Sequence, residues 1–581
     1  MSAAWSRLVF SVLVALPAPV VLAANPIQAE NVKAGTLQWT ISNGATSGEI
    51  EGYASATSVA HRNNLTLFVN TAASGYSIQF FRMGWYGGDG AREMLDQGVR
   101  LPGAVQPPPY VDPSSGMVEC AWNPSYTLAV PDSFVSGIYL AKLTAEGTGK
   151  QSYINFVVRD DSSTSTYLFQ ESVATYQAYN VWGGRSLYTP PAYQVSFNRP
   201  YNYLYSYLAG SVKSYGAGDF FTWDVDMLWW LEREGYDVTY CTDIDTHEDA
   251  LLLPRHRAFL VVGHDEYWSF AMRQNVEQSL QLGVGLGFFG ANDCYWQIRL
   301  EPSRSGQPDR VITCYKDTLR DPYYTAHKPA LYPYVTVRWR EYPVWRPEAA
   351  LVGVQYFSHP GVYNNLIISD ASSWLCMDTG LRNGEFLPGL CGWEVDRITF
   401  DSPRNISIVG STPLPGQMYP AAMTIYRAPG ANAFVFAAGS LIWTWGLMDY
   451  GVGDWRTSRS SLAAMQITRN ALAGMVGYPP GPLAVPGTLS QQVVLSVYPS
   501  PFMAEASVRY TVLKGGGVDV SVFGSDGRRI RGLFAGHREP GNYSSSWDGR
   551  SDTGEQMPPG MYFVRVVAPT GSTSRRVPRL R

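Results

Sequence analysis

The sequence has little charge and few cysteines, and each shortage excludes a class of protein. Asp, Glu, Lys and Arg account for 16% of the 581 residues, and the formal net charge is −4. Because a nucleic-acid partner usually requires a basic face or stripe, no nucleic-acid binding is expected. The six cysteines include no CxxC pair, so neither a disulfide scaffold nor a cysteine zinc site is predicted.

Three catalytic signatures are also missing. No GxSxG motif is present, which excludes the nucleophile elbow of serine hydrolases. The triplet HDE at 264–266 lacks the helical HExxH spacing of zinc proteases. The string GLGFFG at 285–290 fits GxGxxG, but it lies within and just after a predicted strand, whereas a dinucleotide site requires it to open a helix.

The N-terminus carries the only long apolar run. This run follows Arg7, ends at Ala24 and contains two prolines. Because it is short and interrupted for a bilayer that needs about 20 residues, a cleavable signal peptide over 1–24 is favoured over a membrane anchor. We therefore expect a secreted or cell-surface protein with no integral membrane span after processing.

Export to an oxidising compartment permits one to three disulfides. The pairs closest in sequence are Cys376 with Cys391 and Cys294 with Cys314, and the pairing stays open at this level.

The chain is too long for one core, because single cores stop growing at about 250–300 residues. Changes in pattern divide it into several parts. Short alternating runs such as NLTLFVN at 64–70 predict an N-terminal all-β domain, a β-sandwich, over 25–160. Proline and glycine mark a linker at 477–490, and alternation returns in a C-terminal Ig-like β-sandwich over 491–581.

Residues 161–476 alternate strands with helices, which is typical of a mainly parallel α/β sheet. A helix over 222–234 ends at Gly235, and another begins after the N-cap Ser269 and ends near Leu282. The apolar runs at 258–262 and 285–289 are typical of strands buried on both faces. The fold class is thus multidomain α/β plus all-β, with a central, mainly parallel α/β domain.

Polar side chains follow successive strands of this predicted sheet. His264 and Glu266 come after one strand, Asn292 comes after the next, and a polar, aromatic loop at 175–184 follows the first. Ligands of open parallel sheets bind at the carboxyl ends of the strands, so these loops are predicted to face one pocket. The structural alternative is that the His and Asn side chains only form hydrogen bonds that hold the loops in place, and that the aromatic side chains only pack.

For the segment RMGWYGGDG at 82–90, a structural corner or an interface is favoured over a ligand site.

Several ordered motifs carry a family resemblance. They are YQAYN at 176–180, WGGRSLY at 182–188, GYDVTY at 235–240, GHDEYW at 263–268 and FGAN at 289–292. Together they resemble the large, beta subunit of N,N-dimethylformamidase and its relatives, from residues 84–88 to about Val476. The resemblance implies a central domain of the glutamine-amidotransferase-like kind. It also implies an enzyme that hydrolyses a tertiary formamide, using a mononuclear iron held by two tyrosines and a glutamate.

The resemblance also implies roles for individual residues. The implied metal ligands are Tyr139, Tyr179 and Glu266, with Tyr188 and Tyr176 as substitutes for the tyrosines, and the implied catalytic residues are Glu394, His264 and Asn292. Phenolate and carboxylate oxygens are hard, anionic donors that suit ferric iron. Glu394 would take a proton from water and deliver it to the leaving amine, while His264 and Asn292 would orient the substrate or stabilise an oxyanion.

The chain departs from this family in its predicted export and in its C-terminal domain. Motifs such as YPSPF at 498–502 and WDGR at 547–550 resemble the FlgD-like or secretion-sorting β-sandwich of exported bacterial proteins. That resemblance implies contact with a cell surface or with secretion machinery. The two functional hypotheses are a secreted iron-dependent hydrolase of a small amide and a non-catalytic surface or polymer-binding protein; a small partner subunit and the oligomeric state stay open.

We predict that the mature chain begins near Ala24 or Asn25 and is recovered outside the cytoplasm. N-terminal sequencing of the protein from its native host tests this. Met1 retained on membrane-bound protein would contradict it.

Overall fold

The computed structural model describes residues 24–95, 99–189, 191–204, 212–361, 363–431, 433–477, 494–498, 502, 504–512, 514–539 and 541–579. The predicted signal peptide and linker lie outside the described residues, apart from Ala24 and Gly477. No helix in these ranges is both long and apolar enough to cross a membrane. Strands dominate the chain, which is a β-rich multidomain protein with several separate sheets.

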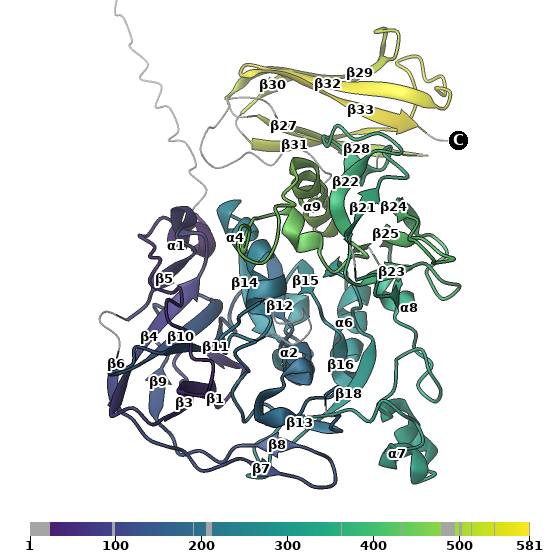
Figure 1. The fold of residues 1–581 in the computed structure, drawn as a ribbon. Helices are drawn as coiled ribbons and strands as arrows, with labels where there is room; N and C mark the ends of the chain where they lie inside the picture. The colour runs from purple at the N-terminus through teal and green to yellow at the C-terminus, as the bar shows by residue number, and fades with distance from the viewer. Residues whose placement is uncertain are drawn as a thin grey trace, which may run out of the picture.

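The first part of the chain forms two packed sheets, drawn in purple and blue in Figure 1. Their facing side chains form a common apolar core, and the strand at 64–71 alternates buried with less buried residues, as predicted. The elements are α1 (Pro26–Asn31), β1 (Ile50–Ala54), β2 (Ser58–Ala60), β3 (Asn64–Thr71), β4 (Gly75–Met83), β5 (Ala91–Glu93), β6 (Val99–Pro102), β7 (Tyr110–Val111), β8 (Val118–Glu119), β9 (Tyr126–Ala129), β10 (Gly137–Ala145) and β11 (Gln151–Arg159).

The central part contains a seven-stranded sheet in the order β14-β12-β15-β17-β26-β25-β24. The first five strands pair in parallel, and the last two pair antiparallel. Strands β12, β14, β15 and β17 are buried along their whole length, as their continuous apolar sequences indicate. The strands are β12 (Tyr167–Glu171), β14 (Val238–Thr242), β15 (Ala258–Gly263), β17 (Gly285–Gly290), β24 (Ser407–Thr412), β25 (Ala421–Arg427) and β26 (Phe434–Ala437).

The helices of the central part follow the local sequence signals closely. The hydroxyl of Ser269 accepts a hydrogen bond from the backbone N–H of Met272 and caps α6, which confirms the predicted N-cap. The predicted helix over 222–234 is divided at Asp224 and stops before Gly235, whose φ is +74°. The helices are α2 (Val173–Tyr179), α3 (Phe220–Trp223), α4 (Val225–Arg233), α5 (Asp243–Glu248), α6 (Phe270–Gln281), α7 (Pro322–Thr325), α8 (Ala349–Val352) and α9 (Leu462–Met475).

Smaller separate sheets accompany the central sheet. A four-stranded sheet has the order β13-β19-β18-β16, and two antiparallel pairs are β20 with β23 and β21 with β22. Their bounds are β13 (Gln194–Ser196), β16 (Tyr267–Ser269), β18 (Trp296–Glu301), β19 (Val311–Thr313), β20 (Gln355–Ser358), β21 (Tyr363–Ile367), β22 (Phe386–Gly392) and β23 (Val395–Arg397).

The C-terminal part is a second pair of antiparallel sheets with a core of its own (Figure 1, yellow). One sheet has the order β27-β28-β31 and the other β30-β29-β32-β33. The strands are β27 (Val494–Tyr498), β28 (Ala506–Val512), β29 (Gly516–Gly524), β30 (Arg529–Arg538), β31 (Gly541–Trp547), β32 (Gly560–Ala568) and β33 (Gly571–Arg579).

All six cysteines are buried as free thiols. The structure therefore bridges neither Cys376 with Cys391 nor Cys294 with Cys314, the two pairs that lie closest in sequence.

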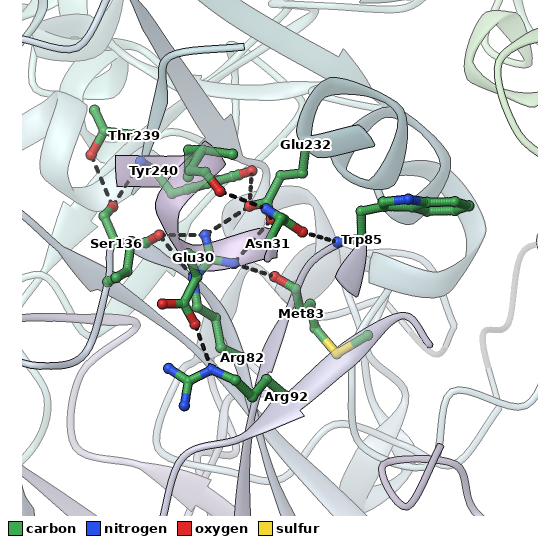
Figure 2. Close-up of polar contacts among 12 residues, drawn as sticks. Glu30, Asn31, Arg82, Met83, Trp85, Arg92, Ser136, Glu232, Thr239 and Tyr240 are labelled. Carbon is green, nitrogen blue, oxygen red and sulfur yellow. Dashed lines mark hydrogen bonds and ion pairs between the residues drawn. The ribbon is translucent and has the colours of Figure 1, made fainter. Parts of the chain in front are cut away.

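A buried ion pair joins the N-terminal part to the central part (Figure 2). Arg82 of β4 donates from Nη2 to Oε1 of Glu232 at 2.7 Å and from Nη1 to Oε2 at 3.0 Å, and both side chains are fully buried. The Tyr240 hydroxyl and the Asn31 amide each donate to Glu232 at 2.8 Å. Buried charges are tolerated only when they are paired and hydrogen-bonded, so this network fixes the interface.

The segment at 82–90 lies at this interface, as predicted. The backbone N–H groups of Trp85 and Tyr86 donate to Oδ1 of Asn31 at 2.8 and 2.9 Å. The aromatic segment is thus tied to α1 and, through Asn31, to Glu232 of α4.

We expect Glu232→Gln to lower the free energy of unfolding by about 3 kcal/mol, because it leaves the Arg82 guanidinium buried without a counter-charge. Urea titration followed by tryptophan fluorescence measures the change. Glu146→Gln is the control, because the ion pair of Glu146 with Arg100 lies on the surface and should change stability little. Equal effects of the two substitutions would contradict the proposed importance of the buried pair.

Candidate active site

Three loops at the carboxyl edge of the central sheet meet at one place. Strand β12 leads into α2, which ends at Tyr179; β15 leads to His264 and Glu266; β17 leads to Asn292. Because β12, β15 and β17 are parallel neighbours, their carboxyl ends share one edge of the sheet. The sheet order therefore explains why residues far apart in sequence come together.

A close backbone approach brings two of these loops into contact. A Cβ atom on Gly290 would lie 1.7 Å from the carbonyl oxygen of Gly263, so only glycine fits there. Two residues later, Asn292 has φ of +59°, a left-handed conformation that Asn tolerates better than most residues. The tight approach places the Asn292 side chain beside His264.

His264, Asn292 and Glu394 form a buried polar triad. Asn292 Nδ2 donates to Glu394 Oε2 at 2.9 Å, and it lies 3.3 Å from His264 Nε2. His264 Nε2 is 3.2 Å from the same carboxylate oxygen. Glu394 arrives from a distant segment, between β22 and β23, and the Asn292 backbone N–H donates to Asp396 Oδ1 at 3.0 Å.

Burial lowers the pKa of His264, but the charge and hydrogen bond of Glu394, together with Glu266, outweigh it and raise this pKa to about 9. The two carboxylates thus favour the imidazolium form of the ring. Oδ1 of Asn292 is buried and accepts no hydrogen bond from the described residues, so it is available to a ligand.

The Glu266 carboxylate lies beside this triad and is held by phenols. The Tyr179 hydroxyl donates to Oε2 at 2.7 Å, and the Tyr188 hydroxyl lies 3.0 and 3.1 Å from the two carboxylate oxygens. The Tyr267 hydroxyl in turn donates to that of Tyr188 at 2.5 Å. Glu266 Oε2 is 3.6 Å from His264 Nε2, so the phenol cluster and the triad form one site.

Burial is the main cause that raises the pKa of Glu266, which the charge of Glu394 raises further while His264 and Lys316 lower it. Burial and the Glu266 charge raise the pKa of Tyr179 well above the usual range. Tyr188 is 39% exposed as a residue, but its hydroxyl contacts Glu266, and the pKa of this phenol is raised in the same direction. Without a further cation, the two phenols are thus neutral donors to the carboxylate.

Lys316 adds a positive charge against the rings of Tyr188 and Tyr267. Its Nζ lies 3.3 Å from the centroid of the Tyr188 ring and 5.3 Å from that of Tyr267, within the range of cation–π contacts. Burial lowers the pKa of Lys316 to about 8, against the opposing effects of Cys314 and Glu266.

The structure brings five of the six predicted side chains together and leaves one out. Tyr139 lies in β10, inside the core of the N-terminal sandwich, where its hydroxyl donates to the Val135 carbonyl at 2.7 Å. Its ring stacks on Phe134 and Phe156 at 5.3 and 5.6 Å. The prediction of Tyr139 as a member of the site is therefore corrected: the phenol beside Tyr179 belongs to Tyr188.

Tyr176, the other substitute tyrosine, donates instead to the buried carboxylate of Asp224. Sequence reasoning missed Tyr267 and Lys316. Tyr267 directly follows Glu266, so the GHDEYW motif contained the signal, whereas nothing in the sequence around Lys316 marks it.

The described part of the chain contains no group of three or more His, Cys, Asp or Glu side chains placed to hold a metal ion. A different donor set is present, made of the Glu266 carboxylate and the Tyr179 and Tyr188 hydroxyls. If both phenols lose their protons, these three groups carry three negative charges, and such hard oxygen donors suit a ferric ion.

Comparisons with known proteins match two parts of the chain. The family model for N,N-dimethylformamidase beta subunit-like proteins, C-terminal part, matches residues 77–456, and the FlgD Ig-like domain matches residues 504–572. The N,N-dimethylformamidase beta subunits of Alcaligenes sp and Paracoccus aminophilus are each 23% identical over 224 residues, which is 32% of this chain and 29% of theirs. The chain thus matches less than a third of the length of these relatives.

Among solved structures, FlgD from P. aeruginosa is 19% identical over 16% of this chain and 78% of its own, with a TM-score of 0.12.

The match to the N,N-dimethylformamidase beta subunit-like family model spans well over half of this chain. The chain therefore belongs to the N,N-dimethylformamidase beta subunit-like family.

Proposed function

We propose that this protein is an iron-dependent amide hydrolase that cleaves the C–N bond of a small amide. Distant homology to the dimethylformamidase beta subunit supports the class of reaction. The observation that carries the proposal is the convergence of two phenols on a buried carboxylate, 3.6 Å from a histidine that contacts a second carboxylate.

Tyr179, Tyr188 and Glu266 would hold the metal. Two phenolates and one carboxylate balance the three positive charges of a ferric ion, which removes the cost of burying anions together. When bound, such an ion polarises an amide carbonyl and lowers the pKa of a bound water.

Glu394 is the proton carrier in this proposal. Its carboxylate accepts the proton of the attacking water and returns it to the amine nitrogen as the C–N bond breaks. Asn292 Nδ2 and His264 Nε2, at 2.9 and 3.2 Å from Glu394, fix its orientation. The imidazolium charge of His264 also favours an oxyanion that develops on the carbonyl oxygen.

Lys316 and Tyr267 position the phenols. The ammonium beside the Tyr188 ring and the Tyr267 hydroxyl at 2.5 Å both favour the deprotonated form of Tyr188.

We further propose that the protein is secreted or held at the cell surface, and that the FlgD-like domain contacts the secretion machinery or the surface. The central sheet is assigned to the glutamine-amidotransferase-like kind, which the parallel order β14-β12-β15-β17-β26 supports.

We expect purified mature protein to bind about one ferric ion per chain and to absorb visible light through phenolate-to-iron charge transfer. Glu266→Ala and Tyr188→Phe should abolish or shift this absorption, because each removes an anionic donor. Tyr139→Phe is the matched control and should leave it unchanged, since Tyr139 lies in the sandwich core. Metal analysis and absorption spectra of the variants provide the measurement.

Colourless, iron-free protein after expression with ample iron would contradict the proposal. It would favour a non-catalytic surface or polymer-binding protein.

We expect Glu394→Gln to lower kcat for release of amine from a small formamide by about 10²–10⁴-fold while iron content stays normal, because it removes the proton carrier but no metal donor. The control is Glu385→Gln. It neutralises an exposed carboxylate directly before β22 and should have no effect on kcat. Full activity of Glu394→Gln would show that another group moves the proton.

A further inference from the structure

A cavity of about 300 Å³ lies between the N-terminal sandwich and the central part, away from the carboxylates of the active site. Its lining includes the Glu51 side chain of β1 and four aromatic residues, Trp182, Tyr201, Tyr203 and Tyr215. Aromatic faces and a carboxylate are the groups with which proteins bind organic ammonium ions.

Glu51 has no cationic partner in the described part of the chain. Trp182 Nε1 donates to Oε2 at 2.7 Å and Asn70 Nδ2 donates to Oε1 at 3.3 Å, and both donors are neutral. Burial raises the pKa of Glu51, as does the nearby charge of Glu49, while the two hydrogen bonds lower it. A partly buried carboxylate held this way lacks a counter-charge, which a cationic ligand would supply.

Two residues connect the wall of this cavity to the surroundings of Tyr179. A smaller cavity of about 10 Å³ is lined by Tyr179 and shares Tyr201 and Asn202 with the larger one. The backbone N–H of Asn202 donates to Oδ1 of Asn180 at 3.0 Å, which ties this wall to the residue that follows Tyr179. Tyr201 and Asn202 thus line both cavities, and Tyr179 lines the smaller one.

We propose that the Glu51 cavity is a binding site for small alkylammonium ions. Its assignment to the amine product rests on the proposed function: hydrolysis of an N-alkyl amide with water gives a carboxylic acid and an amine, and the amine takes up a proton at neutral pH. The cavity would then receive the ammonium ion that leaves the active site. Binding itself does not depend on catalysis.

Calorimetric titration of the mature protein with dimethylammonium and tetramethylammonium chloride tests the proposal, with sodium chloride as the reference titrant. Both organic ions should bind, and Glu51→Gln should weaken binding by about tenfold or more, because it removes the charge but keeps the acceptor for Trp182. Glu146→Gln neutralises a surface carboxylate that does not line the cavity and should leave the affinity nearly unchanged. Circular dichroism and thermal unfolding check that the variants fold.

Three results would overturn the proposal: no binding up to tens of millimolar, equal binding by wild type and Glu51→Gln, or equal binding of sodium. Glu266→Gln separates this inference from the proposed function, because it should lose amide hydrolysis and keep ammonium binding. Ammonium binding without hydrolysis of any amide would defeat the proposed function alone, and hydrolysis without ammonium binding would defeat the cavity alone.

Discussion

The buried carboxylate of Glu266 is the interaction on which the candidate site depends. Removing a carboxylate from water costs several kcal/mol unless hydrogen bonds or opposite charges replace the water. Here two phenol hydroxyls and the nearby imidazolium of His264 do so. Glu394 places a second carboxylate 3.2 Å from the same histidine. The site therefore holds two buried carboxylates beside one imidazole ring. Such a concentration of oxygen donors is typical of a site that holds a cation.

The fold supplies this concentration through two constraints. Because β12, β15 and β17 are parallel neighbours, the loops that follow them all begin at one edge of the sheet. The close contact between Gly263 and Gly290 brings the loops after β15 and β17 together. The Arg82–Glu232 pair fixes the N-terminal sandwich on α4, and the sandwich then contributes Glu51 to the cavity beside the site. The interface therefore positions the cavity, whereas the residues of the site all come from the central part of the chain.

Much of this arrangement could be predicted from local sequence. Continuous apolar runs revealed the buried strands, Ser269 and Gly235 marked helix ends, and the position of His264, Glu266 and Asn292 after strands placed them at one edge. The choice of tyrosine failed because SGIYL around Tyr139 has the pattern of an ordinary strand, and local sequence does not tell which of several phenols faces a distant carboxylate. Lys316 could not be predicted either, since its contact with Tyr188 depends wholly on tertiary packing.

Diffraction at the iron absorption edge from crystals of the mature protein would locate the proposed ferric ion. We expect a single strong anomalous peak per chain, bounded by the hydroxyl oxygens of Tyr179 and Tyr188 and the carboxylate of Glu266. No peak at that position in iron-replete crystals, or a peak at another group of residues, would contradict it.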